Sequence, residues 1–481
     1  MLDIIVIGAG PAGASAAIRA ADLGARTALV TSADFGGMAT NEGPVPIRTL
    51  AYAARLLRDS RDLAQYGIQP SEPVVQFDRL IARARQVIRD VRAHSALRER
   101  IDALGVTVHE RCGMFRFTAP NSIESESGLR LEAEKFIICT GGMSRRLDVP
   151  GIQFTSTYTD VYSLTALPES MLVVGGGGTG VQIAAMFNAF GVRVQLFEAG
   201  RQILASEDQA IADAVSTELR ASGVMVYERF GTITSFEKTP SGVRMNYLSD
   251  NEEASAQAEI VLIAAGWVAD TTRLNLDVPG VAVDKRGNIT VDEFLRTTAP
   301  HVFAAGDVIG RVMLVPGAIE DGFVAATNAV QGTAHPVRHR VIPAGSFSHP
   351  EYAQVGLTEA KARQGHEVLV AVAPFAAAIR PIIERHTFGF GKLIVDRANG
   401  RILGCHVVGN QAVEIAQLAA VAIAAEMPVG DLAGVAISFP TYAEVLSHAA
   451  IRAAVKLGLS VTGRAELVRT SRADIDVGPA R

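Results

Sequence analysis

Two glycine clusters, each set between an apolar strand pattern and a helix pattern, constrain the fold of this 481-residue chain most strongly. The first, Gly8-Ala-Gly10-Pro-Ala-Gly13, follows the β-branched run at residues 3–7 and precedes an alanine-rich helix pattern. In a dinucleotide-binding βαβ unit, the first glycine permits the tight turn, the second lets the backbone approach a pyrophosphate, and the third permits close helix–strand packing. The helix N-terminus then favours the phosphates because its N–H groups are unpaired. We therefore predict a first nucleotide site at these three glycines.

The second cluster repeats the order of strand, turn and helix 167 residues further on (175 − 8). Its glycines are Gly175, Gly177 and Gly180. The next strand pattern, residues 193–197, is followed by Glu198. An acid at that place hydrogen-bonds a ribose 2′-hydroxyl and repels a 2′-phosphate, which favours NAD(H) over NADP(H). Arg201 lies three residues beyond Glu198 (201 − 198) and can soften that preference, so NADP(H) remains open.

A third motif follows the first nucleotide unit, at residues 36–50. Its letters read Gly-Gly-Met-Ala-Thr-Asn-Glu-Gly-Pro-Val-Pro-Ile-Arg-Thr-Leu. This resembles the redox-disulfide segment of the pyridine nucleotide-disulfide oxidoreductases, the family of dihydrolipoamide dehydrogenase, whose pattern is Gly-Gly-x-Cys-x-Asn-x-Gly-Cys-x-Pro-x-Lys. The frame is kept at Gly36, Gly37, Asn41, Gly43 and Pro46. Ala39 and Pro44 stand where the two cysteines belong.

Two later segments carry the same resemblance. Residues 136–142 end in Thr140-Gly-Gly142, and the strand pattern at residues 302–305 is followed by Gly-Asp. The family uses this aspartate to bond the ribityl chain of FAD. The resemblance therefore implies an FAD site built from Gly8, Gly10, Gly13, Thr31, Gly37, Thr140, Gly141, Gly306 and Asp307. It also implies that NAD is held by Gly175, Gly177, Gly180, Glu198 and Gly266.

Thr31 is a departure from this pattern, because an acid normally ends the second strand of the FAD unit. A threonine hydroxyl makes one neutral hydrogen bond in place of two charge-assisted ones. Asp34 is the nearest acid that could compensate. We expect FAD to be held mainly by its other contacts.

The order of these motifs predicts an α/β fold with two Rossmann-like nucleotide-binding domains and a C-terminal α+β dimerisation domain. The predicted limits are 1–150 and 275–340 for the FAD domain, 151–274 for the NAD domain, 341–464 for the interface domain and 465–481 for a fraying tail. Helices are expected at residues 46–64 and, as one long amphipathic helix, at 77–104. The apolar run at residues 418–425 is expected to be a packed core helix.

The active-site positions depart from the family together. The general base of the family lies in a His-Pro-Thr-x-x-Glu motif from the other subunit, and here the motif reads Phe439-Pro-Thr-Tyr-Ala-Glu444. Phenylalanine cannot carry a proton, and Ala39 and Pro44 cannot supply a thiolate nucleophile. Dithiol–disulfide chemistry is therefore excluded, because both the thiols and the general base that it needs are absent. His448 can pair with Glu444 at i,i+4, or it is a surface or interface histidine.

A lysine–glutamate pair that lies near flavin N5 in the family is replaced by Arg48 and Gln182. We hypothesise that Arg48 leaves net positive charge near the flavin and raises its reduction potential. The alternative is that Arg48 pairs with Glu42 or another acid. The predicted catalytic positions are Arg48, Ala39, Pro44, Gln182, Phe439 and Glu444. Trp267, the single tryptophan, replaces an arginine after Gly266 and is expected to pack at a domain boundary.

Three functions are weighed. The first is an FAD-dependent NAD(P)H oxidoreductase, preferring NADH, that passes electrons to a small non-disulfide acceptor such as a quinone, as in relatives without the active disulfide. The second is a soluble NAD(P) transhydrogenase, against which Glu198 speaks. The third is a non-catalytic sensor that binds flavin and NADH. A metal-ion reductase like mercuric reductase is disfavoured, because the tail from residue 466 to 481 carries no cysteine pair.

Composition removes several other classes of protein. The net charge of −5 comes with no long basic run, which gives nucleic-acid binding no electrostatic support. No apolar run approaches the roughly 18 residues of a membrane span, and no signal peptide precedes the first strand. The three cysteines, Cys112, Cys139 and Cys405, lie far apart without metal-ligand spacing, so we expect reduced thiols, no metal and a cytoplasmic homodimer.

Overall fold

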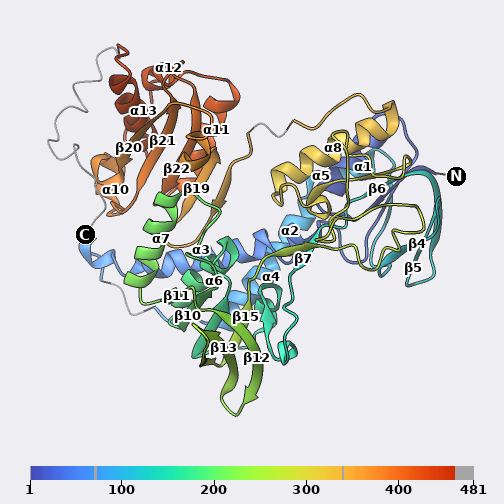
Figure 1. Ribbon diagram of the computed structural model, residues 1–481, viewed down its shortest axis with the longest axis horizontal. Coiled ribbons are helices and arrows are strands. Elements are labelled where there is room, and N and C mark those ends of the chain that lie inside the picture. Colours follow the sequence, from blue (N-terminus) through green and yellow to red (C-terminus); the bar gives the residue numbers. More distant parts are fainter. Residues whose placement is uncertain (1, 70–72, 339–340, 461–481) are drawn as a thin grey trace.

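The computed structural model describes residues 2–69, 73–338 and 341–460, and its α/β architecture has three lobes (Figure 1). The first lobe is a seven-stranded sheet in the order β3-β2-β1-β6-β5-β4, with β17 also paired to β6. Its strands are β1 (Leu2–Ile7), β2 (Thr27–Val30), β3 (Thr107–His109), β4 (Phe115–Ala119), β5 (Ser122–Ser125), β6 (Arg130–Ile138) and β17 (Val302–Ala304). Strands β3, β2, β1, β6 and β17 are parallel, whereas β4 and β5 extend the sheet as an antiparallel hairpin.

The second lobe contains a five-stranded parallel sheet in the order β11-β10-β9-β15-β8. Its strands are β8 (Ser156–Thr157), β9 (Ser170–Val174), β10 (Arg193–Glu198), β11 (Met225–Glu228) and β15 (Ile260–Ile263). A three-stranded antiparallel sheet lies beside it, formed by β12 (Thr232–Thr239), β13 (Gly242–Ser249) and β14 (Glu252–Ala258). A two-stranded ribbon, β7 (Gly142–Ser144) with β16 (Trp267–Ala269), connects this lobe to the first.

The third lobe is an antiparallel sheet in the order β18-β19-β22-β21-β20. Its strands are β18 (Ala344–Ser346), β19 (Tyr352–Gly356), β20 (Val368–Pro374), β21 (Phe390–Asp396) and β22 (Ile402–Val408). Its helices are α9 (Glu359–Ala362), α10 (Ile379–Ile383), α11 (Ala412–Ala424), α12 (Val429–Gly434) and α13 (Glu444–Lys456). The predicted fold class is confirmed by these three sheets.

The remaining helices cover the first two sheets. They are α1 (Pro11–Asp22), α2 (Gly37–Asn41), α3 (Pro44–Ser60), α4 (Phe77–Ala93), α5 (Ala96–Ala103), α6 (Gly178–Ala189), α7 (Gln209–Ala221) and α8 (Val315–Gln331). Short 3₁₀ turns occupy residues 63–66, 152–154, 158–163, 306–309 and 375–377. Helix α1 packs closely on α8, because its buried positions are alanines and Gly322 of α8 lies directly on the Ala12 backbone.

Helix α3 extends from the first lobe to the second, where it packs on α6. Its residues Ile47, Leu50 and Ala54 share an apolar core with the buried face of α6. Proline is tolerated at the start of α3 because the first N–H groups of a helix have no intrahelical partner. The segment that precedes α3 is thereby fixed between the two nucleotide-binding sheets.

Three sequence expectations need correction. The single helix expected at 77–104 is two helices, because the chain breaks at His94 and the Ser95 hydroxyl caps α5 by accepting the Arg98 N–H (3.4 Å). Helix α3 begins at Pro44 and ends at Ser60, not at 46 and 64. The run at 418–425 is not fully packed, since Leu418 and Val421 lie exposed on α11. The predicted tail, 465–481, lies outside the described residues.

Candidate flavin and nicotinamide site

The first glycine turn joins β1 to α1 and is closed by its own backbone. A Cβ atom on Gly8 would lie 2.2 Å from the Cys139 carbonyl oxygen, and one on Gly13 would lie 1.7 Å from the Gly8 oxygen. A Cβ on Gly10 would have no neighbour nearer than 3.9 Å. Gly8 and Gly13 are therefore required by the fold itself, whereas Gly10 leaves free space of the kind a pyrophosphate needs.

The second turn, between β9 and α6, has the same construction. A Cβ on Gly175 would lie 2.4 Å from the Ala264 oxygen, and one on Gly180 would lie 1.8 Å from the Gly175 oxygen. A Cβ on Gly177 would have no neighbour within 4 Å among the described residues. Two independent turns therefore share one pattern of two packed glycines around one open glycine.

Glu198 ends β10 beside this second turn. One of its carboxylate oxygens accepts the Gly176 N–H (2.7 Å) and the other accepts the Gly200 N–H (2.6 Å). The acid is thus held at the edge of the turn, and a ribose hydroxyl would add to these two bonds. Gly266 lies at the start of the connecting ribbon, where its carbonyl oxygen accepts the Arg145 N–H (2.9 Å).

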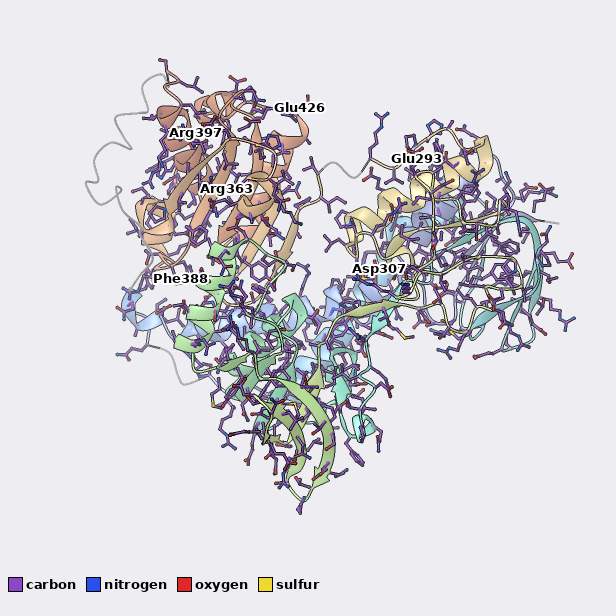
Figure 2. All side chains as sticks on the ribbon, viewed as in Figure 1. Glu293, Asp307, Arg363, Phe388, Arg397 and Glu426 are labelled. Atoms are coloured by element: carbon purple, nitrogen blue, oxygen red, sulfur yellow. The ribbon has the colours of Figure 1, made fainter. Side chains whose placement is uncertain are left out.

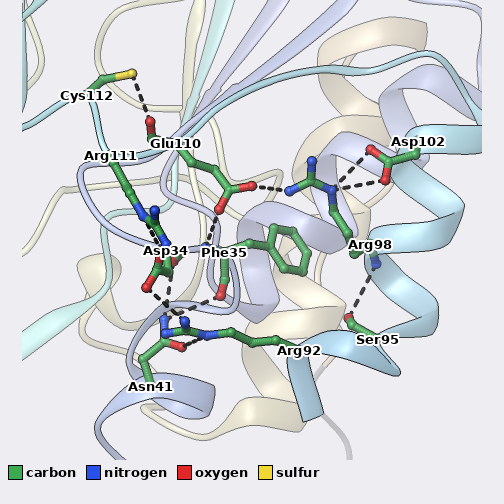
Figure 3. Close-up of polar contacts among 10 residues, drawn as sticks. All are labelled: Asp34, Phe35, Asn41, Arg92, Ser95, Arg98, Asp102, Glu110, Arg111 and Cys112. Carbon is green, nitrogen blue, oxygen red and sulfur yellow. Dashed lines mark hydrogen bonds and ion pairs between the residues drawn. The ribbon is translucent and has the colours of Figure 1, made fainter. Parts of the chain in front are cut away.

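Thr31 lies at the equivalent edge of the first sheet. Its residue is only 8 % exposed, and its hydroxyl makes no hydrogen bond with any described residue. Asp34 does not replace the missing acid, because its carboxylate is held by Arg111 (2.6 Å) and Arg92 (2.8 Å), as Figure 3 shows. Arg92 also bonds the Asn41 side chain (2.7 Å), which ties this loop to α2.

Asp307 follows β17, at the point where the first lobe meets the β7–β16 ribbon (Figure 2). Burial, together with the negative charge of Asp321, raises the pKa of the Asp307 carboxyl to about 6. That carboxyl accepts no hydrogen bond from the described residues. Across from it, the Thr140 hydroxyl donates to the Asp270 carbonyl (2.8 Å), and Gly141 accepts the Asp270 N–H (3.1 Å).

Asp270 is a functional candidate that sequence reasoning missed. Its side-chain Oδ1 is buried and has no hydrogen-bond partner in the described part of the chain, and burial raises its pKa. A buried polar atom without a partner is destabilising unless a ligand or water satisfies it. Nothing in the local sequence indicates this, because the Asp270 backbone meets Thr140 and Gly141 only through the fold.

The segment of α2 and the start of α3 lies against the first turn. The Gly36 N–H donates to the Ala9 carbonyl (2.9 Å), and a Cβ on Gly37 would lie 2.6 Å from the Gly10 Cα. Ala39 and Pro44 are half-buried here. Tyr158 closes one side with its hydroxyl, and its ring meets Trp267 edge-on (5.1 Å between centroids), so Trp267 packs at the lobe boundary as expected.

Arg48 and Gln182 are brought together by the third lobe. The Arg48 guanidinium lies over the Phe347 ring (3.8 Å to the centroid), and the Ser346 hydroxyl donates to the Gln182 side-chain oxygen (3.5 Å). Among the described residues no carboxylate lies within 4.0 Å of Arg48, and the acids that act on its charge from further away are Glu351 and Glu414, not Glu42. Helix α6 therefore meets β18 at this site, and α3 meets the residue that follows β18.

Within the described part of one chain, no contact connects Phe439 or Glu444 to Arg48 or Gln182. Phe439 precedes α13 and is 72 % exposed, while Glu444 is buried and accepts the Ile379 N–H (3.0 Å). The second Glu444 oxygen has no partner in the described chain. His448 makes no ion pair with Glu444 there, and burial lowers the pKa of its imidazole. The role of this motif opposite another subunit stays a prediction.

Comparison with known proteins decides the family. The family model of pyridine nucleotide-disulphide oxidoreductases matches residues 2–322, and the model of their dimerisation domain matches residues 342–450. The chain belongs to this family. Its relatives include dihydrolipoyl dehydrogenase of Zymomonas mobilis subsp. mobilis, at 32 % identity over 461 residues covering 94 % of this chain and 97 % of that one.

Two further proteins are similar to this chain over most of its length. Mercuric reductase of Bacillus cereus is 30 % identical, over 93 % of this chain and 71 % of that protein. The Cu(II) complex of the HOCl-induced flavoprotein disulfide reductase RclA from Escherichia coli superimposes with a TM-score of 0.83 at 27 % identity, over 93 % of this chain and 98 % of that one. The family uses FAD and NAD(P)H.

The residues of the first lobe fit FAD as this family binds it. Gly10 leaves room for a pyrophosphate. Among the described residues the Asp270 Oδ1 is buried without a hydrogen-bond partner, and the Thr31 hydroxyl and the Asp307 carboxyl make no side-chain hydrogen bond either. Among the described residues, no group of three or more His, Cys, Asp or Glu side chains is placed to hold a metal ion. No described helix has the length and apolar character needed to cross a membrane.

We expect Thr31→Glu to raise the affinity for FAD about tenfold, because a carboxylate there adds charge-assisted bonds to the ribose hydroxyls. Thr31→Val should lower the affinity a few-fold by removing the hydroxyl. The measurement is the FAD dissociation constant from quenching of flavin fluorescence on titration of the apoprotein. An order of affinities other than Glu, Thr, Val would show that this edge does not contact the ribose.

We expect FAD affinity to increase as the pH rises from 5 to 7, with a midpoint near 6. The raised pKa of Asp307 means that the carboxyl is protonated below about pH 6 and becomes a full acceptor for a ribityl hydroxyl above it. The same flavin titration at several pH values measures this. Asp307→Asn should flatten the profile, and a profile unchanged by that substitution would assign the titration to another group.

Proposed function

We propose that this protein is an FAD-dependent NADH oxidoreductase that passes electrons to a small non-disulfide acceptor such as a quinone. The observation that carries the proposal is the side chains beside the first glycine turn, where Ala39 and Pro44 take the places of two thiols. The three cysteines are free and lie elsewhere in the chain. A family member without thiols at those positions needs another exit for its electrons.

The bound flavin would supply hydride acceptance from the nicotinamide and electron donation to the acceptor. Residues of this chain would position the two cofactors and exclude water. The turns at Gly10 and Gly177 admit the two pyrophosphates, and Glu198 positions the ribose of the pyridine nucleotide. Ala39 and Pro44 present an apolar surface that excludes water, while Arg48 holds a positive charge beside it.

Several finer points belong to the same proposal. The dimerisation domain supports a homodimer, in which Phe439 and Glu444 of one subunit complete the site of the other. NADH is preferred over NADPH because Glu198 disfavours a 2′-phosphate. The domain limits predicted from the sequence and a cytoplasmic location are part of the proposal as well.

Anaerobic stopped-flow mixing with NADH tests the proposal. We expect rapid bleaching of the flavin, slow reoxidation in air and rapid turnover with added quinones. An absence of bleaching would favour a non-catalytic NADH sensor. Rapid reduction of NADP⁺ analogues by NADH would favour a transhydrogenase instead, and lipoamide reduction would contradict the proposal outright.

The double variant Ala39→Cys/Pro44→Cys provides a matched control. It restores the two thiols but leaves Phe439 in place of the base, so we expect no lipoamide reduction. The triple variant that adds Phe439→His restores the base as well. Lipoamide activity in the triple variant only would show that thiols and base were lost as one unit.

A further inference from the structure

Arg48 lies at the junction of the three lobes, and among the described residues no carboxylate lies within 4.0 Å of its guanidinium. It lies one helical turn beyond Pro44 on α3 (48 − 44 = 4), so both side chains are on the same face of the helix. Arg48 is exposed, and its only recorded side-chain partner in the described chain is the Phe347 ring, at 3.8 Å. A guanidinium without a direct ion pair in the described chain therefore lies one turn from Pro44 on the same face of α3.

No described group that faces Arg48 makes a direct ion pair with it. Gln182, on α6, is uncharged and bonds Ser346. Glu351 and Glu414 of the third lobe are the acids that act on Arg48 electrostatically, and each lies beyond 4.0 Å. Glu351 accepts the Val413 N–H (2.9 Å), and burial together with Glu414 raises its pKa, which shifts it toward the neutral form.

Phe347 holds the guanidinium in a useful orientation. A ring stacked on one face of the guanidinium leaves the N–H groups at its edge free, and those N–H groups form a planar fork that suits a two-oxygen anion. Although the residue is exposed, desolvation of the guanidinium by its neighbours lowers the pKa of Arg48, and an arginine still stays charged in proteins. A partly desolvated cation gains most from an anion that arrives with its own apolar surface.

We propose that Arg48, held on Phe347, binds an anionic group of the electron acceptor, so that the acceptor is a flat aromatic oxidant bearing a carboxylate, sulfonate or ionised hydroxyl. The inference rests on the proposed function and specifies its substrate class. In the reaction, NADH gives up a hydride, which carries two electrons and one proton. The quinone gains two electrons and two protons and becomes the quinol, with the second proton taken from solvent.

This role differs from tuning of the flavin potential. A changed potential alters the reduction of every quinone, whereas an anion-binding role alters the ratio between a charged and a neutral acceptor. The decisive quantity is the ratio of kcat/KM for 1,4-naphthoquinone-2-sulfonate to kcat/KM for 2-methyl-1,4-naphthoquinone. Each variant then serves as its own control, because both acceptors withdraw electrons from the same flavin.

We expect Arg48→Met to lower this ratio about tenfold, mainly through the KM of the sulfonated quinone. Arg48→Lys should lower it less, because the charge remains but the fork is lost. In the natural protein the ratio should fall with added salt, and in Arg48→Met it should not. The matched control is Arg55→Met on the same helix, whose side chain pairs with Asp59 (3.5 Å) and which should leave the ratio unchanged.

A binding measurement separates this inference from the proposed function. The dissociation constant of 2-naphthalenesulfonate, which cannot be reduced, should rise about tenfold in Arg48→Met and stay unchanged in Arg55→Met. If neither quinone is turned over but this difference in binding is seen, the acceptor class is wrong and the anion site stands. An equal ratio and equal binding in the natural protein and Arg48→Met would overturn the inference, whatever the turnover.

Discussion

Replacing Gly177 with alanine is expected to weaken NADH binding roughly 10- to 100-fold while leaving the thermal unfolding temperature unchanged. The added Cβ meets no atom within 4 Å in the protein, so the fold tolerates it. It does occupy the space through which we propose that the pyrophosphate passes close to the backbone. The NADH dependence of flavin bleaching in the stopped flow measures the binding, and calorimetry measures the unfolding temperature.

Gly180 supplies the matched control within the same turn. Alanine there would place its Cβ 1.8 Å from the Gly175 carbonyl oxygen, which forces the strand and α6 apart. We therefore expect Gly180→Ala to lower the unfolding temperature as well as NADH binding. If Gly177→Ala destabilised the protein as much as Gly180→Ala, or bound NADH normally, the open space at Gly177 would not be the pyrophosphate path.

Lys392→Met is expected to destabilise the protein by about 3–5 kcal/mol, because it leaves buried carboxylates without their cation. The Lys392 ammonium bonds Asp208 (2.7 Å) and Glu359 (2.7 Å), and the Lys392 and Asp208 side chains are only 6 % and 2 % exposed. Asp208 also caps α7, and its second oxygen accepts the Glu359 N–H (2.9 Å). These ion pairs and this hydrogen bond therefore connect the second lobe to the third.

Urea unfolding followed by fluorescence and by flavin release measures this loss. Arg363→Met is the control, since Arg363 pairs with the same Glu359 (2.6 Å) from an exposed position, where a pair contributes at most about 1 kcal/mol. Burial alone would raise the pKa of Asp208, but Lys392 and the Glu359 N–H lower it. Equal losses in Lys392→Met and Arg363→Met would show that burial of the cluster contributes nothing.

Much of the fold follows from local sequence because its signals are local. A β-branched strand, a glycine turn and an alanine-rich helix are contiguous, so the sequence predicts both nucleotide turns and the roles of Gly8 and Gly180. The break at Ser95 was missed because a charged helix pattern continues across it. Only the capping bond from the Arg98 N–H to the Ser95 hydroxyl shows where α4 and α5 part.

The features of the candidate site also fall into those that the sequence predicts and those that only the structure shows. The sequence by itself determined the family frame, and it placed Ala39, Pro44, Arg48 and Gln182 where we predict that two thiols and a lysine–glutamate pair are replaced. Only the tertiary structure decided that Asp34 is held by two arginines, that the Asp270 Oδ1 has no partner among the described residues, and that Arg48 rests on Phe347 with no described carboxylate within 4.0 Å. These facts depend on residues tens to hundreds of positions apart, whose contacts are set by packing of whole lobes and leave no trace in local sequence.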